Sequence, residues 1–349
     1  MLADHCVGLP CLPGLKLTTG CYHFLFKFWV TLFHCHKEDF DYDALCLEQL
    51  LSSGQDACPC GDLPFLLENN LRTAYALLMS AYKTKMPLES LIIRLVVYGL
   101  GSLTLRSAAC VWNDICDVDF DRQVERTKVR PLASGAVSMA GAYIYLISLT
   151  FAFVGTLYML ESKEAFYQGV FDVAVLNLIY PLMKRVTYLP QAWLGLAINW
   201  GFVVAWVDVS GRGSNMSWND FEVLAYGMVS LASWTIVYDT IYACQDLNDD
   251  KRAGVKSTAL LFGSYLPSIL RLFAAIYIGS LAYIGYLNGQ GVWFYAVSVV
   301  GSALHMLWQL GTHNPMSAAN CKERFDSNIN LGGIVTGGLL VDYLFRVVI

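Results

Sequence analysis

Long hydrophobic runs with almost no charged residues dominate the chain from residue 86 onward. Each run covers about 18 to 23 residues, which is the length of α-helix that crosses a bilayer core of about 30 Å. The pattern predicts eight membrane-spanning helices, at 88–112, 137–159, 166–183, 190–209, 221–243, 266–287, 291–311 and 331–349. A ninth run, at 18–35, fits the same pattern less well. The expected fold is therefore all-α, a polytopic transmembrane helical bundle of eight to nine spans.

The composition favours membrane insertion over a soluble helical fold. Of the 349 residues, 56% are hydrophobic and 15% are charged, whereas a soluble domain carries about 25% charged residues. The formal net charge is −5 and no basic stripe is present, so a nucleic-acid partner is not expected. Membrane lipid is the expected surrounding.

The first 70 residues differ from the rest of the chain. Seven of the eleven cysteines lie there, acidic residues gather at 38–43, and no helical period is clear. Cys58 and Cys60 have no second cysteine pair or histidine at zinc-ligand spacing nearby, so free thiols are expected. We expect residues 1–70 to form a divergent N-terminal segment and residues 71–349 to form one membrane domain.

The loops between the predicted helices differ in charge. Because each span crosses once, one side receives the loops 113–136, 184–189, 244–265 and 312–330, which carry eleven lysines and arginines. The loops of the opposite side carry only Lys163 and Arg212. The positive-inside rule predicts that the basic side is cytosolic.

The N-terminus gives a further indication of location. Residues 1–40 contain no arginine and include Asp4, Glu38 and Asp39, unlike a mitochondrial transit peptide. An endomembrane location, in the endoplasmic reticulum, is therefore favoured over the mitochondrial inner membrane.

An acidic cluster follows the first predicted span. Asn113, Asp117 and Asp121 are spaced i, i+4 and i+8, so on a helix they share one face, and Asp114 lies beside that face. These carboxylates repel one another at the membrane edge unless a cation binds between them. Mg²⁺ is the favoured ion, because it is held by one or two carboxylates together with substrate phosphates.

A second acidic cluster follows the span at 221–243. Asp239, Asp246 and Asp250 are spaced i, i+7 and i+11, again on one helical face. Asp246 and Asp250 are predicted metal ligands. Asp239 lies deeper and is, with Asp114, a candidate for a structural or proton-handling role. Both clusters lie on the basic side and can face each other.

Basic residues follow each acidic cluster. After the first come Arg122, Arg126, Lys128 and Arg130, and after the second come Lys251, Arg252 and Lys256. Their charge and geometry suit phosphate recognition. The same residues also fit a purely topological role at the membrane surface.

The two acidic motifs resemble the signatures of UbiA-type membrane prenyltransferases. The first comprises Asn113-Asp114-x-x-Asp117-x-x-x-Asp121, then Arg126-Thr127 and Arg130-Pro131-Leu132-Ala133-Ser134-Gly135. The second comprises Tyr238-Asp239-x-x-Tyr242-Ala243-x-x-Asp246-x-x-x-Asp250, then Gly254-Val255-Lys256-Ser257-Thr258. Three further stretches are similar to eukaryotic 4-hydroxybenzoate polyprenyltransferases: Tyr180-Pro181-Leu182-Met183-Lys184-Arg185, Asn199-Trp200-Gly201 and 321–332.

The resemblance covers 86–349 and implies nine helices around a central cavity that opens to lipid. It implies Mg²⁺ at Asn113, Asp117, Asp121, Asp246 and Asp250. It further implies contacts from basic residues to the substrate diphosphate, namely Arg122, Arg130, Lys184 and Lys256. The family's Arg-x-Asp-Lys-Pro-x-Gly stretch in the first span has no match in residues 1–70.

The reaction expected from this resemblance is transfer of a prenyl group from a prenyl diphosphate to an electron-rich carbon. Breaking the allylic C–O bond creates a carbocation, which aromatic side chains stabilise by facing it. The candidates for the prenyl and acceptor pocket are Tyr180, Asn199, Tyr238 and Tyr242, with Trp200 at a similar depth.

The preferred function is farnesyl transfer from farnesyl diphosphate to an aromatic or pyrone polyketide-type acceptor, in meroterpenoid (secondary-metabolite) biosynthesis. One alternative is a 4-hydroxybenzoate polyprenyltransferase of ubiquinone biosynthesis, and another is a UbiA-like terpene cyclase. A cation transporter is a third, since intramembrane carboxylates also mark ion pathways. The acidic residues gather at one edge beside basic residues, which disfavours transport.

Overall fold

The computed structural model describes residues 63–123, 127–210, 216–247 and 256–349. The chain divides into two units, Met1–Asp41 and Tyr42–Ile349, and every described residue belongs to the second. Within these ranges the regular structure is helical and contains no strand, which confirms the all-α prediction. The run at 18–35 and most of the predicted N-terminal segment lie outside the described residues.

The main helices follow one another with short connections. They are α3 (Leu63–Thr84), α4 (Leu88–Asp121), α5 (Pro131–Ser134), α6 (Met139–Leu157), α7 (Lys163–Phe171), η2 (Asp172–Asn177), α8 (Leu178–Val186), α9 (Pro190–Ala197), α10 (Trp200–Ser210), α11 (Trp218–Ala243), η3 (Cys244–Asp246), α13 (Thr258–Phe262), α14 (Leu266–Asn288), η5 (Phe294–Val299), α15 (Val300–Thr312), α16 (Ala318–Asp326) and α17 (Asn328–Tyr343).

Seven helical stretches of the described chain are long and apolar enough to cross a membrane: Leu88–Asp121, Met139–Leu157, Lys163–Met183, Pro190–Ser210, Trp218–Asp246, Thr258–Asn288 and Ala318–Val348. They correspond to seven of the eight predicted spans. The eighth prediction, 291–311, is also helical, as η5 and α15. It is not among the seven, and His305 and Gln309 make it more polar than the others.

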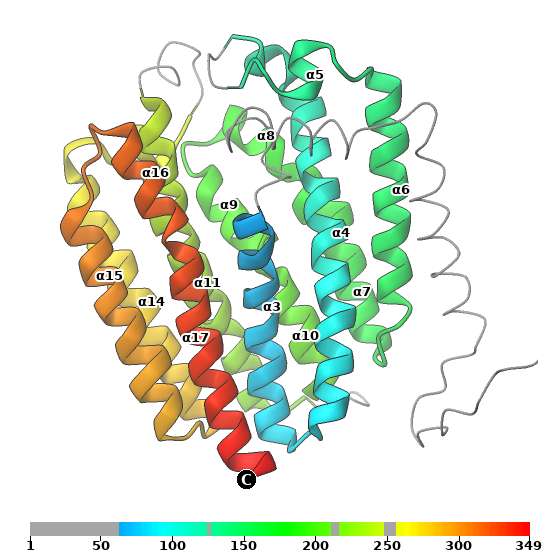
Figure 1. Ribbon diagram of the computed structural model, residues 1–349, viewed down its shortest axis with the longest axis vertical. Coiled ribbons are helices and arrows are strands. Elements are labelled where there is room, and N and C mark those ends of the chain that lie inside the picture. The colour runs from blue at the N-terminus through cyan, green and yellow to red at the C-terminus, as the bar shows by residue number, and fades with distance from the viewer. Residues whose placement is uncertain (1–62, 124–126, 211–215, 248–255) are drawn as a thin grey trace, which may run out of the picture. The chain divides into compact units, whose positions relative to one another are not determined.

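Helix α3 was not among the predicted spans. Its apolar run is interrupted by Glu68, Arg72 and Lys83, so the helix contains no uncharged window of membrane-spanning length. Residues 74–82 are nevertheless buried on all sides of the helix, and α3 packs against α17, α10 and α4 (Figure 1). A helix that is buried all round belongs to the centre of a bundle. It runs through residue 70, where the sequence suggested a boundary.

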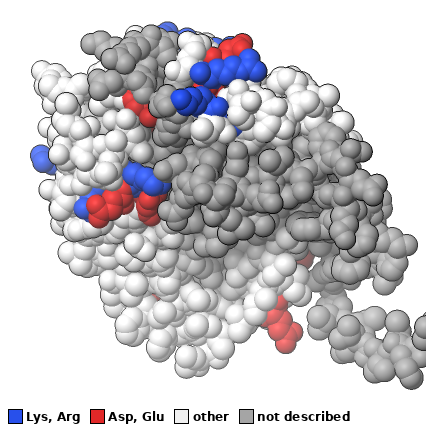
Figure 2. Space-filling view, turned by 45° about the horizontal axis from the view of Figure 1, so that its top comes forward, with Lys and Arg blue, Asp and Glu red and all other residues white. Residues whose placement is uncertain are grey.

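The predicted basic side corresponds to one end of the bundle. The short helix α5, the end of α8 and α16 lie together at this end, at the top of Figure 1, while the C-terminus lies at the other. In Figure 2 this end is turned forward, and charged side chains stand in small groups among mostly uncharged ones. We call it the charged end.

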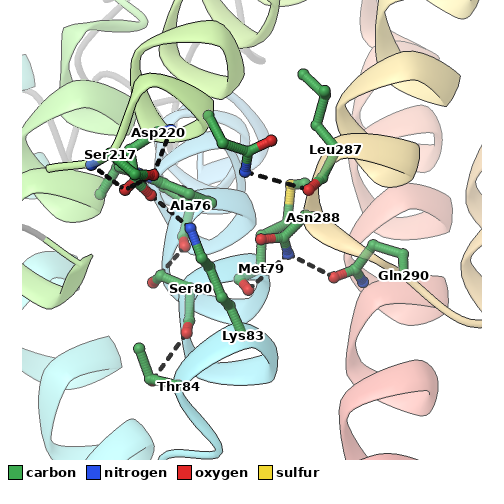
Figure 3. A network of polar contacts seen from close by, with 12 residues as sticks. Ala76, Met79, Ser80, Lys83, Thr84, Ser217, Asp220, Leu287, Asn288 and Gln290 are labelled. Carbon is green, nitrogen blue, oxygen red and sulfur yellow. Dashed lines mark hydrogen bonds and ion pairs between the residues drawn. The ribbon is translucent and has the colours of Figure 1, made fainter.

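Polar contacts join helices at the opposite end. Lys83 of α3 reaches Asp220 at the start of α11, with 2.6 Å between Nζ and Oδ1. Asp220 also completes a capping box with Ser217, so it fixes the start of α11. Nearby, the Asn288 amide donates to the carbonyl oxygen of Met79 at 2.8 Å and to Gln290 (Figure 3). These contacts hold α3, α11 and α14 in register far from the acidic motifs.

Close helix packing depends on glycine at α11. A Cβ atom added to Gly227 would lie 2.6 Å from the ring of Phe202 on α10. Small residues at such crossings let helix backbones approach closely, which is a common way of packing helices in membranes.

Candidate active site

A cavity of about 230 Å³ lies among α4, the η2–α8 segment, α9, α10 and α11. It brings together seven of the residues predicted from the sequence: Asn113, Asp114, Arg130, Tyr180, Tyr238, Asp239 and Tyr242. The two acidic motifs, separated by more than 100 residues in sequence, therefore contribute to one cavity wall.

The first motif forms the last turns of α4. Asp114, Asp117 and Asp121 are buried there, and Asn113 is half-buried. Arg130, just before α5, places Nη1 3.1 Å from Asp114 Oδ1 and 2.9 Å from Asp121 Oδ2. Burial lowers the pKa of Arg130, but these carboxylates outweigh that effect and raise its pKa above the usual value. Arg130 is thus a permanent cation inside the motif.

The second motif forms the end of α11 and continues into η3. Tyr238, Asp239 and Tyr242 line the cavity, and the rings of Tyr238 and Tyr242 pack on Phe325 of α16, at centroid distances of 5.8 and 4.7 Å. Asp246 is half-buried in η3. Asp250 lies outside the described residues.

The end of α8 touches both motif regions. Arg185 donates a 2.6 Å hydrogen bond to the carbonyl oxygen of Cys116 and lies 4.0 Å from Asp117 Oδ1. One residue further, the carbonyl oxygen of Val186 accepts a hydrogen bond from Lys256 at 3.3 Å. This segment therefore connects α4 to the residues that follow the second motif.

Four other predicted site residues lie outside the cavity wall or have no described side chain. Arg122 is exposed and pairs with Asp119 at 3.5 Å, and neither Arg122 nor Lys256 is part of the cavity wall. The side chain of Lys184 is outside the described part. Asn199 is buried and is not part of the cavity wall; its amide nitrogen donates to Gly195 O at 2.7 Å and Thr235 Oγ1 at 2.9 Å. These two hydrogen bonds join α9 to α11.

The chemistry of the charged end suits a hard cation. Carboxylate and amide oxygens come from α4 and η3, and oxygen donors are the ligands that Mg²⁺ prefers. Among the described residues, no three His, Cys, Asp or Glu side chains are close enough to form a complete metal site. The oxygen donors present suit an ion that takes part of its coordination from a bound diphosphate, as Mg²⁺ commonly does.

Sequence reasoning missed three charged or amide residues of the cavity wall: Arg106, Asp172 and Asn177. Arg106 lies seven residues before Asn113, and this spacing places both on one face of α4. Asp172 is a carboxyl group inside a predicted span, and such residues are functional candidates by default. A search for isolated charges within the spans would have found both.

Away from the charged end the cavity is largely apolar. Val97, Phe153, Leu157, Leu160 and Val204 contribute to this part of the wall. A site with a charged mouth and an apolar interior suits a ligand with an anionic head and a hydrocarbon tail.

Comparison with known proteins agrees with this geometry. The sequence model of the UbiA prenyltransferase family matches residues 71–332. The UbiA prenyltransferase claS of Ampulloclitocybe clavipes is 47% identical over 278 residues, which cover 78% of this chain and 85% of that protein. The mitochondrial 4-hydroxybenzoate polyprenyltransferase of Schizosaccharomyces pombe is 38% identical, with 78% and 74% covered.

Solved structures share the fold. The apo structure of a UbiA homolog from Aeropyrum pernix K1 has a TM-score of 0.68 at 24% identity, and the likeness covers 79% of this chain and 97% of that one. The structure of a UbiA homolog from Archaeoglobus fulgidus bound to GPP and Mg²⁺ has a TM-score of 0.55 at 16% identity, covering 81% and 100%.

The chain belongs to the UbiA prenyltransferase family. It is therefore a transferase enzyme with a helical membrane fold, and the cation transporter is removed from the alternatives.

Proposed function

We propose that this enzyme transfers a prenyl group from a prenyl diphosphate to a ring carbon of an aromatic acceptor, with Mg²⁺ as cofactor. The observation that carries this proposal is one cavity whose wall takes Asn113 and Asp114 from the first motif and Asp239 from the second, with apolar residues further in. That polarity matches a prenyl diphosphate from head to tail. The prenyl diphosphate and Mg²⁺ in the Archaeoglobus fulgidus homolog support the assignment.

The diphosphate head is proposed to bind at the charged end. Asn113, Asp117, Asp121, Asp246 and Asp250 would hold Mg²⁺, which when bound neutralises charge on the leaving diphosphate. Arg130 would contact the same head, because its guanidinium lines the cavity within reach of the first motif. Lys184, Arg122 and Lys256 remain proposed diphosphate ligands.

The carbocation and the ring would meet below this head. Tyr180, Tyr238 and Tyr242 line the cavity and can turn ring faces toward the developing allylic cation. After the ring carbon attacks, Asp239 is proposed to accept the ring proton, since its carboxyl group belongs to the same wall. Asp114 contacts Arg130 and would hold it in position.

An acidic acceptor would find a cation in Arg106. Its side chain lines the cavity about 10 Å from the level of Asn113, given seven residues at 1.5 Å each. A guanidinium binds a carboxylate through two parallel hydrogen bonds. We propose that Arg106 holds the carboxylate of an aromatic acid.

The preferred substrates are farnesyl diphosphate and an aromatic or pyrone polyketide-type acid, in meroterpenoid biosynthesis. The chain is 47% identical to claS, whose name specifies no acceptor, and 38% identical to the mitochondrial 4-hydroxybenzoate enzyme of Schizosaccharomyces pombe, so the comparison leaves room for another acceptor. The proposed location is the endoplasmic reticulum, with the charged end facing the cytosol. Residues 71–349 are the proposed catalytic domain.

A second candidate is 4-hydroxybenzoate polyprenyl transfer. The Schizosaccharomyces pombe enzyme of that name is 38% identical over 275 residues. An aromatic acid with a ring hydroxyl is therefore a reasonable first acceptor to test.

The test uses microsomes that contain the full chain, supplied with Mg²⁺, farnesyl or geranyl diphosphate, and a panel of 4-hydroxybenzoate, orsellinic-type acids and pyrones. Mass spectrometry should detect a prenylated acid. Product from a polyketide-type acid supports the meroterpenoid role, and product from 4-hydroxybenzoate alone supports the second candidate. Diphosphate release without any prenylated product would overturn the proposal and favour a cyclase.

A further inference from the structure

The cavity wall contains a turn of π-helix at η2 (Asp172–Asn177), between α7 and α8. Pro181 lies inside α8 and has no N–H to donate to the carbonyl oxygen of Asn177, four residues earlier. A missing bond of this kind relaxes the helix locally, and wide turns are frequent at functional sites. The sequence thus provides a physical reason for the π-turn.

The π-turn brings Asp172 and Asn177 together. In a regular α-helix, residues five apart point about 140° away from each other. The wider turn produced by hydrogen bonding from i to i+5 brings them closer to one face. The Asn177 amide nitrogen donates to Asp172 Oδ1 at 2.8 Å and to the Asp172 carbonyl oxygen at 3.2 Å. Both side chains line the cavity.

These hydrogen bonds orient the pair. Because Asn177 uses its nitrogen toward Asp172, its side-chain oxygen must point the other way. Asp172 is only 2% exposed and lines the cavity. A polar group that is largely removed from water depends on its hydrogen bonds, so a ligand that bonds to it gains specificity.

The pair lies at a useful depth. Trp112 of α4 donates to the carbonyl oxygen of Leu178 at 3.0 Å across 66 residues, and Arg185 reaches Cys116 across 69 residues. Subtracting these separations of 66 and 69 from residue 172 places Asp172 level with residues 103–106 of α4, which include Arg106. Asn113 is about 10 Å nearer the charged end. Asp172 is therefore well below the expected diphosphate site, and Asn177 lies between the two levels.

We propose that Asp172 and Asn177 bind the hydroxyl group of the acceptor and select acceptors that carry one on the ring. A hydroxyl both donates and accepts hydrogen bonds, so it suits two oxygen atoms at the end of an apolar wall. The pair is an acceptor-specificity site and not a diphosphate or metal site. This inference rests on the proposed aromatic prenyl transfer.

The test compares two acids that differ by one hydroxyl, 4-hydroxybenzoate and benzoate, as ligands of the full chain in membranes. In the unaltered enzyme the hydroxyl should strengthen binding roughly tenfold, as expected for a buried hydrogen bond. Asp172→Leu, similar in size, should reduce this preference to within about twofold. The KM for the prenyl diphosphate should stay within about twofold of its original value, because the pair lies away from the charged end.

Two further variants make the result decisive. Asn177→Leu should also weaken the preference, and it serves if Asp172→Leu fails to accumulate in the membrane. Val175→Ala changes the same turn outside the cavity wall and should leave the preference unchanged.

The outcomes separate the two proposals. If the unaltered enzyme prenylates acceptors but both leucine variants retain the tenfold preference, the hydroxyl site is overturned. If the unaltered enzyme prenylates no aromatic acceptor, the proposed function itself fails.

Discussion

Arg130 Nη1 lies 3.1 Å from Asp114 Oδ1, and Arg130 belongs to the loop that follows α4. The sequence suggested Arg130 as a phosphate ligand, and the contact gives it a second role within the protein. Arg130 also contacts Asp121, so one guanidinium pairs with two acidic residues of the first motif. An incoming diphosphate would meet Arg130 already oriented.

Replacing Arg130 should therefore affect both binding and stability. Arg130→Gln should raise the KM for the prenyl diphosphate at least about tenfold, because a charge-assisted contact is worth roughly 1.5–3 kcal/mol. It should also lower the free energy of unfolding by about 1–3 kcal/mol, since it removes a cation between two buried carboxylates. Arg271→Gln, which changes an exposed residue of α14 outside the cavity wall, is the control. Equal effects of both variants would contradict the role of Arg130.

The metal assignment predicts a sharp contrast along α4. Asp117→Ala should leave the protein inserted in the membrane but lower kcat by about 1,000-fold, because positioned charge at the leaving group contributes several kcal/mol. Asp246→Ala should behave alike. Asp119→Ala, two residues from Asp117 and 85% exposed, should retain activity. Turnover measured in membranes, with insertion checked by protease protection, decides between these outcomes.

The seven long apolar stretches could be predicted from the length of their uncharged runs, and the meeting of the two motifs from the alternation of loops between the two sides. Helix α3 could not be found as an uncharged run, since it contains the buried Arg72. The guanidinium of Arg72 lies over the rings of Trp234 and Tyr238, at 4.8 and 4.9 Å from their centroids. A cation held by aromatic faces costs less in the core than its charge suggests.

The Asp172–Asn177 pair could not be predicted from the sequence for a different reason. Read with the α-helical period, residues five apart fall on different faces, and only the π-turn places them together. Asn199 illustrates the opposite case. Its motif suggested a pocket residue, but the side chain turns toward Thr235 of α11. Sequence spacing cannot determine which side of a buried helix faces the cavity.

Asn199→Ala should accordingly reduce stability more than catalysis. The variant removes buried hydrogen bonds to Gly195 and Thr235, so the free energy of unfolding should fall by about 1–3 kcal/mol. The KM values for donor and acceptor should change by less than about twofold. Thermal unfolding in detergent and steady-state kinetics provide the comparison. A large rise in either KM at unchanged stability would instead place Asn199 in the pocket.

Gly227 should not tolerate a larger side chain. Gly227→Ala places a Cβ 2.6 Å from the Phe202 ring, and the overpacking should cost about 1–3 kcal/mol. Gly279→Ala is the matched control, because nothing lies within 4 Å of the added carbon. The control should be neutral or stabilising by up to about 1 kcal/mol. Similar melting temperatures for both variants would show that α10 and α11 are not closely packed at Gly227.

Metal dependence of prenyl transfer tests the account most directly. Microsomes with the full chain, prenyl diphosphate and 4-hydroxybenzoate or a polyketide-type acid should yield a prenylated product, which a chelator abolishes and added Mg²⁺ restores. Asp117→Ala should yield almost none. Transfer that continues in excess chelator, or that survives the loss of Asp117, would contradict the central claim that both aspartate motifs act through Mg²⁺ on the diphosphate.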